Sequence, residues 1–250
     1  MNPPRPHIYD ADNARLLCQA SADAYAQAGE GTMVDDTATD TRVVLTTRGD
    51  NLIVAFRGTA DLRNWLTDLD CLMVQDSITQ GLVHAGFFAA LHSVWDELVE
   101  AMDDQPLKCV WLTGHSLGGA LAMLAAAWLQ DAANFDESIQ LQGVYTFGQP
   151  RLGNAYFRDH YDFYLRARTF RVVHDDDIVP RVPWFVGRFR HAGHEVFFPD
   201  LMAEPLFDCA LPRKLLYDIP GAIRLLTRDR LALIADHHIQ SYLNLFKQAA

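Results

Sequence analysis

One segment in the middle of the chain constrains the fold more than any other. A short apolar run at 109–113 is followed by GHSLGG (114–119) and then by an apolar stretch that continues to about residue 130. The first run predicts a buried strand and the second a buried helix, so Ser116 falls in a sharp turn between them. A glycine stands two residues before and two residues after Ser116, where side chains would collide in such a turn. The pattern therefore predicts a serine held at the C-terminal end of a strand, with the N–H groups of a helix aimed beside it.

Strands and helices alternate along the rest of the chain. Apolar strands that follow one another between helices indicate a mainly parallel sheet with helices on both faces. A hairpin signal at Gly49-Asp50 predicts an antiparallel edge near the N-terminus. With no repeat or linker in view, we expect a single α/β domain over residues 1–250. The expected helices are 11–25, 87–102, 117–130, 155–164 and 235–247, and the expected strands are 42–47, 51–57, 109–113, 143–147, 169–174 and 195–198.

Composition excludes several classes of protein. With 32 acidic and 21 basic residues, the net charge of -11 argues against broad binding to phosphate backbones. The apolar stretch at 117–129 is shorter than the roughly 18–20 residues of a spanning helix, so no transmembrane segment is expected. No secretory signal is visible and the four cysteines form no CxxC pair, which favours the cytoplasm, although a mature secreted chain would look the same.

A serine nucleophile needs a histidine base and an acid that orients it. Three carboxylates, Asp175, Asp176 and Asp177, follow the expected strand at 169–174, where sites form in parallel sheets. His237 and His238 lie at the start of the last expected helix, and either could be the base. The spacing of His191 and His194 suggests metal binding, but no clear third ligand accompanies them, so no metal site is predicted.

Six blocks of sequence occur in an order that is typical of one family. They are FRGTADLRNWLTDLD from Phe56, VHAGF from Val83, TGHSLGGALAML from Thr113, TFGQPRLGN from Thr146, DDIVPRVP from Asp176 and DHHIQSYL from Asp236. Together they resemble the fungal-type class 3 triacylglycerol lipases, which have the α/β-hydrolase fold. The resemblance extends from about residue 15 to residue 245.

This resemblance implies a role for particular residues. Ser116 matches the nucleophile, Asp177 the acid, and His237 the base, with His238 as the second choice. Thr59 and Leu117 match the two residues whose backbone N–H groups form the oxyanion hole. The implied activity is the hydrolysis of acyl esters, with lipids as the expected substrates, and the resemblance implies no metal or organic cofactor. A phospholipase, an esterase for soluble esters and a catalytically silent lipid-binding protein remain the alternatives.

The roles of three further segments are less determined. Leu62, Trp65, Leu66 and Leu69 fall at helical spacing after Thr59, at the position of the family's lid helix, but a permanently packed amphipathic helix would show the same pattern. At about 201–234 the chain departs from the family pattern with apolar-rich material, for which we expect a helical insertion. Residues 184–190 mix aromatic and basic side chains and are a second candidate for contact with a lipid surface, besides the 62–73 segment. The oligomeric state is not predicted.

Overall fold

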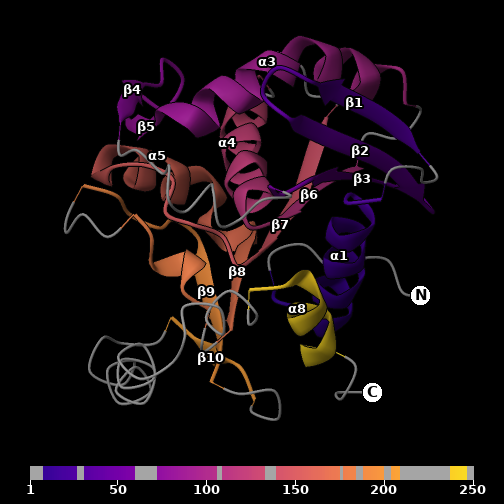
Figure 1. The fold of residues 1–250 in the computed structure, drawn as a ribbon, viewed down its shortest axis with the longest axis vertical. Helices are drawn as coiled ribbons and strands as arrows, with labels where there is room; N and C mark the ends of the chain where they lie inside the picture. Colours follow the sequence, from indigo (N-terminus) through magenta and orange to yellow (C-terminus); the bar gives the residue numbers. More distant parts are fainter. Residues whose placement is uncertain are drawn as a thin grey trace.

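The computed structural model describes residues 8–26, 31–59, 72–105, 109–132, 139–174, 177–183, 188–199, 204–208 and 237–246. Figure 1 shows a twisted sheet through the middle of the molecule with helices on both sides of it. Among the described residues, eight strands form this sheet in the order β1-β2-β3-β6-β7-β8-β9-β10.

The sheet is antiparallel at its N-terminal edge and parallel in its centre. Strands β1, β2 and β3 pair antiparallel, whereas β3, β6, β7, β8 and β9 run parallel to one another. Strand β10 closes the other edge antiparallel to β9. The bounds are β1 Thr32–Asp36, β2 Thr41–Arg48, β3 Asn51–Phe56, β6 Cys109–His115, β7 Gln140–Phe147, β8 Thr169–His174, β9 His194–Phe198 and β10 Leu206–Phe207. The predicted mainly parallel sheet with an antiparallel N-terminal edge is confirmed.

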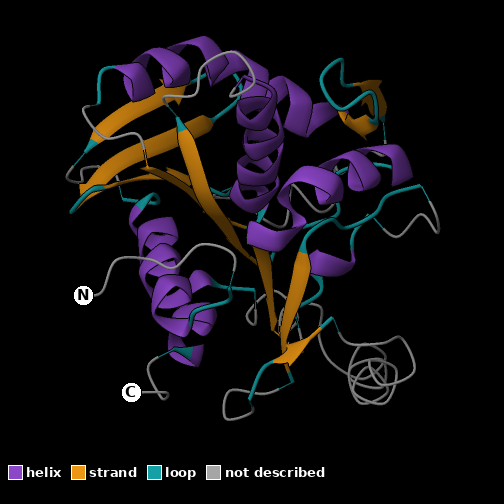
Figure 2. Ribbon diagram, turned by 180° about the vertical axis from the view of Figure 1, so that it is seen from behind, coloured by secondary structure: helices purple, strands orange, loops and turns teal. Residues whose placement is uncertain are grey.

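Helices cover both faces, as the sequence predicted. Helices α3 (Ala85–Asp103), α4 (Leu117–Ala132) and α5 (Ala155–Leu165) lie on one side, and α1 (Ala11–Asp23) and α8 (Ile239–Leu245) lie on the other. In Figure 2, which is seen from behind, the orange strands pass between these two groups of helices. Two 3-10 turns, η1 (Arg166–Arg168) and η2 (Val179–Arg181), and a small hairpin of β4 (Met73–Gln75) and β5 (Leu82–His84) complete the described elements.

Two apolar clusters hold these layers together, one on each face of the sheet. The larger contains α3, α4 and one face of the strands, and the smaller contains α1, α8 and the other face. Strand β6 is buried at every position after its first, because both of its faces are covered. Helix α4 is buried at every position from 118 to 129, which explains why this part of its sequence has no polar side chain.

The last helix differs from the prediction. It was expected at 235–247, but it begins at Ile239, and the backbone of His238 is extended at φ -61 and ψ 138 as its N-cap. Both histidines therefore precede the helix, in a turn that can approach the strand ends. Strands β1, β4, β5 and β10 were not predicted, because they are short and mix polar with apolar residues.

Several sequence predictions fall on other parts of the chain. The candidate lid residues Leu62, Trp65, Leu66 and Leu69 lie outside the described residues. So does most of the segment at 201–234, in which the described residues 204–208 contain β10. The helical insertion and the lid therefore stay predictions. In the part of the chain that the structure describes, no helix has both the length and the apolar character to cross a bilayer.

Candidate functional site

Ser116 occupies the turn that its flanking glycines predicted. It lies between β6 and α4 with φ +60, in the left-handed region that residues with a Cβ rarely adopt. A Cβ at Gly118 would lie 2.1 Å from the carbonyl oxygen of Phe56, and one at Gly114 would lie 2.3 Å from Gly118. The N–H of Ser116 donates to the carbonyl of Phe147 at 2.9 Å, which fixes the turn to the end of β7. The backbone strain at Ser116 is thus held by its surroundings, as is common at functional sites.

Asp177 and His237 form a buried pair, although 60 residues separate them in the sequence. Oδ2 of Asp177 lies 2.7 Å from Nδ1 of His237, and the two side chains are 0% and 2% exposed. Oδ1 of Asp177 accepts a hydrogen bond from the N–H of Val179 at 2.8 Å. The carboxylate is therefore held by the backbone on one oxygen and by the histidine on the other.

Tyr242 gives the same carboxylate a third partner. Its hydroxyl donates to Oδ2 of Asp177 at 2.5 Å and accepts from the N–H of His174 at 3.3 Å. Burial, and then the nearby charge of Asp177, raises the pKa of Tyr242 well above its usual value, so the hydroxyl stays protonated and remains a donor.

The partners of His237 determine where its proton sits. Since a carboxylate only accepts, Nδ1 of His237 carries the hydrogen and Nε2 is bare in the neutral ring. Within the described part of the chain, both Nε2 of His237 and Oγ of Ser116 are buried without a hydrogen-bond partner. A serine mechanism needs a hydrogen bond between these two atoms, and neither has another partner among the described residues. In free enzymes the hydrogen bond between a catalytic serine and its base is often long.

Two contacts bring the serine turn and the acid–base pair together. Phe147, which binds the N–H of Ser116, is followed by Gly148, and a Cβ on Gly148 would lie 2.7 Å from Oδ2 of Asp177 and 2.8 Å from Cε1 of His237. On the other side, the ring centroids of His115 and His237 are 4.5 Å apart. Ser116, Asp177 and His237 therefore lie around one edge of the sheet.

Thr59 and Leu117 lie beside the serine. Leu117 is the first residue of α4, where backbone N–H groups have no partner within the helix. Thr59 follows Gly58 in the turn after β3, and a Cβ on Gly58 would lie 3.2 Å from Cβ of Ser116. Leu117 is thus the residue after Ser116, and Thr59 follows a glycine that packs against Ser116.

The rival residues are placed elsewhere. His238 is exposed, whereas His237 is buried. Asp175 and Asp176 lie outside the described residues. His191 and His194 do not share a ligand site, because Nε2 of His191 contacts the carbonyl of Pro180 and Nδ1 of His194 contacts Asp208. Among the described residues, no group of three or more His, Cys, Asp or Glu side chains is arranged to hold a metal ion.

The sequence did not single out two side chains of this site. His115 places Nδ1 2.9 Å from the hydroxyl of Tyr25 and Nε2 2.7 Å from the carbonyl of His237. The GHSLGG motif could have drawn attention to His115, because this residue directly precedes Ser116. Nothing in the local sequence pattern relates His115 to Tyr25, which lies 90 residues earlier.

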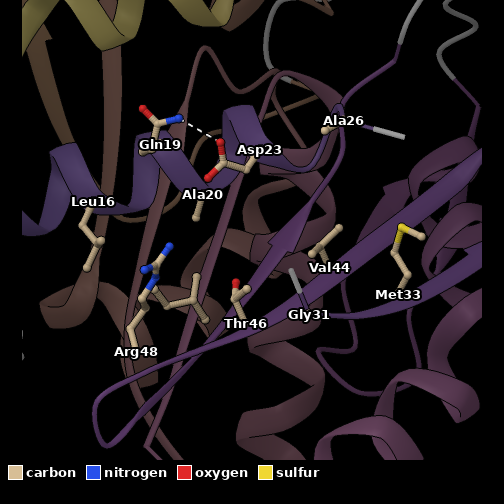
Figure 3. Close-up of a pocket in the computed structure, with 11 residues that line it drawn as sticks. Leu16, Gln19, Ala20, Asp23, Ala26, Gly31, Met33, Val44, Thr46 and Arg48 are labelled. Atoms are coloured by element: carbon tan, nitrogen blue, oxygen red, sulfur yellow. Dashed lines mark hydrogen bonds between the residues drawn. The ribbon is translucent and has the colours of Figure 1, made fainter. Parts of the chain in front are cut away.

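A separate hollow of about 280 Å³ lies between α1 and the antiparallel strands β1–β3 (Figure 3). Its walls include apolar residues such as Leu16, Met33 and Val44, together with Arg48 and the hydrogen-bonded Gln19 and Asp23. Ser116, Asp177 and His237 are not among its lining residues, so this hollow is distinct from the site.

Comparison with known proteins agrees with this geometry. Residues 53–187 match the family model described as lipase (class 3). A lipase of Rhizomucor miehei is 34% identical over 202 residues, which cover 78% of this chain and 54% of that protein. A secreted mono- and diacylglycerol lipase of Fusarium solani is 36% identical over 150 residues, or 58% of this chain and 43% of its own. The chain thus spans about half the length of these curated relatives.

A solved structure supports the fold. It is a triacylglycerol lipase described as having a serine protease triad as its catalytic centre, and it superposes with a TM-score of 0.70 at 28% identity, over 78% of this chain and 83% of that one. The family model alone covers more than half of the residues. The chain therefore belongs to the class 3 lipase family and has the α/β-hydrolase fold.

Proposed function

We propose that this protein is a serine hydrolase that cleaves the acyl esters of lipids through an acyl-enzyme on Ser116. The observation that carries the proposal is the pairing of a strained serine, whose Oγ has no partner within the described residues, with a buried His237–Asp177 pair at the same sheet edge. The lipase relatives support the choice of ester hydrolysis over other reactions of a serine nucleophile.

The residues divide the reaction between them. Nε2 of His237 takes the proton of Ser116 as Oγ attacks the ester carbonyl, and later gives it to the departing alcohol. Asp177 keeps the proton of His237 on Nδ1 and stabilises the imidazolium that forms. A water molecule, activated by the same histidine, then hydrolyses the acyl-enzyme and releases the fatty acid.

The N–H groups of Thr59 and Leu117 stabilise the oxyanion of each tetrahedral intermediate. Loss of one donor of this kind costs about 10²- to 10³-fold in kcat. The position of Leu117 at the N-terminus of α4 adds the favourable end of the helix dipole. This part of the mechanism uses the backbone, so it depends on the shape of the two turns rather than on the identity of the side chains.

Neutral acylglycerols are the substrate class that we favour. The relatives named above are lipases, and that from Fusarium is described as acting on mono- and diacylglycerols. A protein with a net charge of -11 is repelled by anionic phospholipid surfaces, whereas a neutral acylglycerol surface presents no such barrier.

The test of the mechanism compares four variants on one ester. Ser116→Ala, Asp177→Asn and His237→Ala are each expected to lower kcat for a soluble short-chain ester by at least about 10³-fold, because each removes a member of one catalytic unit. His238→Ala is the matched control and is expected to stay active, since its side chain is exposed and precedes the helix. Near-normal turnover by Ser116→Ala, or failure of a fluorophosphonate to label Ser116, would contradict the proposal.

A second experiment tests the substrate. Rates are measured on tributyrin-like acylglycerols and on anionic phospholipid vesicles, below and above the concentration at which each substrate aggregates. Faster hydrolysis of the neutral ester supports the substrate class, and a rate jump on aggregation supports contact with a lipid surface. Preference for the anionic phospholipid would show that net charge does not select the substrate.

A secreted location is part of the proposal. The cysteine pattern favoured the cytoplasm, but the comparisons give that preference no support, because the Fusarium relative is named a secreted lipase. Recovery of the protein from the growth medium of its natural host rather than from washed, lysed cells would support secretion, and the reverse distribution would refute it.

A further inference from the structure

His115 is a buried histidine that the proposed mechanism does not use. It precedes the nucleophile directly and is 5% exposed. Its two ring nitrogens have different partners, the hydroxyl of Tyr25 at Nδ1 and the carbonyl oxygen of His237 at Nε2. A ring in this position could hold the base, exchange protons with it, or only fill space.

The partners of His115 fix its tautomer. A carbonyl oxygen can only accept, so Nε2 of His115 carries the hydrogen that reaches the carbonyl of His237 at 2.7 Å. Nδ1 is then bare, and the hydroxyl of Tyr25 must donate to it across 2.9 Å. Burial, and then the nearby ring of His237, lowers the pKa of His115 well below its usual value, which keeps the ring neutral. His115 is therefore a fixed donor to the backbone and not a second proton carrier.

Tyr25 extends the connection to the opposite flank of the serine. The Tyr25 hydroxyl packs against the backbone of Gly58, and burial raises the pKa of the phenol, which keeps it protonated as a donor. The contact is close, since a Cβ on Gly58 would lie 2.2 Å from the Tyr25 oxygen and 2.6 Å from the carbonyl of His115. Gly58 directly precedes Thr59, so Tyr25 touches the turn that carries one of the proposed oxyanion donors.

We infer that Tyr25 and His115 are positioning residues that lock the oxyanion turn at 58–59 and the turn of the catalytic base at 237 in register with the nucleophile. Two hydrogen bonds run in one direction, from the hydroxyl of Tyr25 to His115 and from His115 to the carbonyl of His237, and the same Tyr25 hydroxyl packs against Gly58. These contacts join the turn at 58–59, the residue before Ser116 and the turn at 237, and among the described residues no strand pairing includes residue 237. The inference rests on the proposed function, because it assigns the pair to the same site.

The least disruptive test removes a single hydroxyl. Tyr25→Phe is expected to lower kcat for a soluble ester about tenfold or more with little change in KM, because sub-ångström displacement of the base and the oxyanion donor affects the transition state more than binding. Labelling of Ser116 by a fluorophosphonate should slow in parallel. The matched control is Tyr145→Phe, which removes another tyrosine hydroxyl next to α1, one whose partners are the N–H of Asp10 at 3.1 Å and the carbonyl of Ile8 at 3.5 Å. This control should lose stability but retain kcat.

Variants at residue 115 separate positioning from packing. His115→Gln keeps an N–H near the place of Nε2 and is expected to retain more kcat than His115→Leu, which fills space but cannot donate. In the Leu background, Tyr25→Phe should have almost no further effect, since the chain is already broken. Active-site titration corrects each rate for the fraction of protein that is folded. If His115→Leu does not fold, the comparison of Tyr25→Phe with Tyr145→Phe still tests the inference.

The outcomes distinguish this inference from the proposed function. The positioning role is refuted, and the proposed function is kept, if Ser116→Ala is inactive but Tyr25→Phe keeps kcat within about twofold. The same conclusion follows if Tyr25→Phe loses no more kcat than Tyr145→Phe. Equal kcat in the Gln and Leu variants would also refute it. If Ser116→Ala remains active, the proposed function itself is refuted.

Discussion

Gly148 offers a sharp test of how tightly the acid–base pair is packed. The residue follows β7 at φ +61, and a Cβ there would lie 2.7 Å from Oδ2 of Asp177 and 2.8 Å from Cε1 of His237. Heavy atoms in ordinary contact are about 3.5 Å apart or more, so Gly148→Ala requires the pair to retreat by about 0.7–0.8 Å. A displacement of about 1 Å in a catalytic group can cost on the order of 10² in rate. We therefore expect kcat for a soluble ester to fall about tenfold to a hundredfold, with KM nearly unchanged.

The same substitution also has a backbone cost, which must be measured separately. A residue with a Cβ in the left-handed region costs about 1–2 kcal/mol relative to the ordinary regions. Gly49 provides the matched control, because its φ of +57 is almost the same but nothing lies within 4 Å of the position of its Cβ. Gly49→Ala should therefore lose similar stability in urea unfolding while keeping the kcat of the unchanged protein.

The assay measures kcat and KM for the soluble ester with Gly148→Ala and Gly49→Ala, at a temperature well below the unfolding transition of both variants. A fully folded Gly148→Ala protein with unchanged kcat would show that the pair has room that the structure does not show. An equal loss of kcat in Gly49→Ala would show that lowered stability, and not displacement of His237, reduces the rate. Either result would contradict the prediction that Gly148→Ala lowers kcat by displacing Asp177 and His237.

Two further predictions concern the buried tyrosines. Tyr242→Phe is expected to lower the free energy of unfolding by about 1.5–3 kcal/mol, measured in urea, because it removes a hydrogen bond to the buried Asp177 carboxylate and leaves the N–H of His174 unpaired; an unchanged stability would contradict the contact. At alkaline pH, burial raises the pKa of Tyr145 to about 12 and raises the pKa values of Tyr25, Tyr161 and Tyr242 as well. The unfolded chain then releases these protons first, so stability should be full below about pH 10 and should fall by up to about 1.4 kcal/mol per pH unit and tyrosine above it. Urea unfolding followed from pH 9 to pH 12 would test the sign, and a stability that rises with pH would contradict it.

The serine turn could be predicted because its constraints are local. Residues 109–130 contain the strand, the glycines and the apolar helix in succession, and the structure places β6, Ser116 and α4 within a few residues of the expected positions. The position of Leu117, the proposed oxyanion residue, follows from the same segment. No information from distant parts of the chain is needed to place the nucleophile at a strand end.

The choice of acid and base could not be made from the residues alone. Three consecutive aspartates and two consecutive histidines offer six pairs, and their side chains differ only in how the folded chain orients them. In the structure His237 is buried against Asp177, while His238 is exposed and caps α8. The family resemblance selected the same pair, but the physical reason is the start of the last helix at Ile239, which the apolar periodicity placed too early.

The residues around the proposed site have a common topological origin. Strands β3, β6, β7 and β8 are neighbours and run parallel, so their C-terminal ends lie along one edge of the sheet. The residues that follow them are Gly58 and Thr59, Ser116, Gly148, and Asp177, in the order of the strands. Each of the four strands thus positions different residues of the proposed site. A shift of one strand by a single residue would displace its residues relative to those of the other three strands. His237, the proposed base, follows none of these four strands, so its alignment depends on contacts of its own, with Asp177 through the side chain and with His115 through the backbone carbonyl.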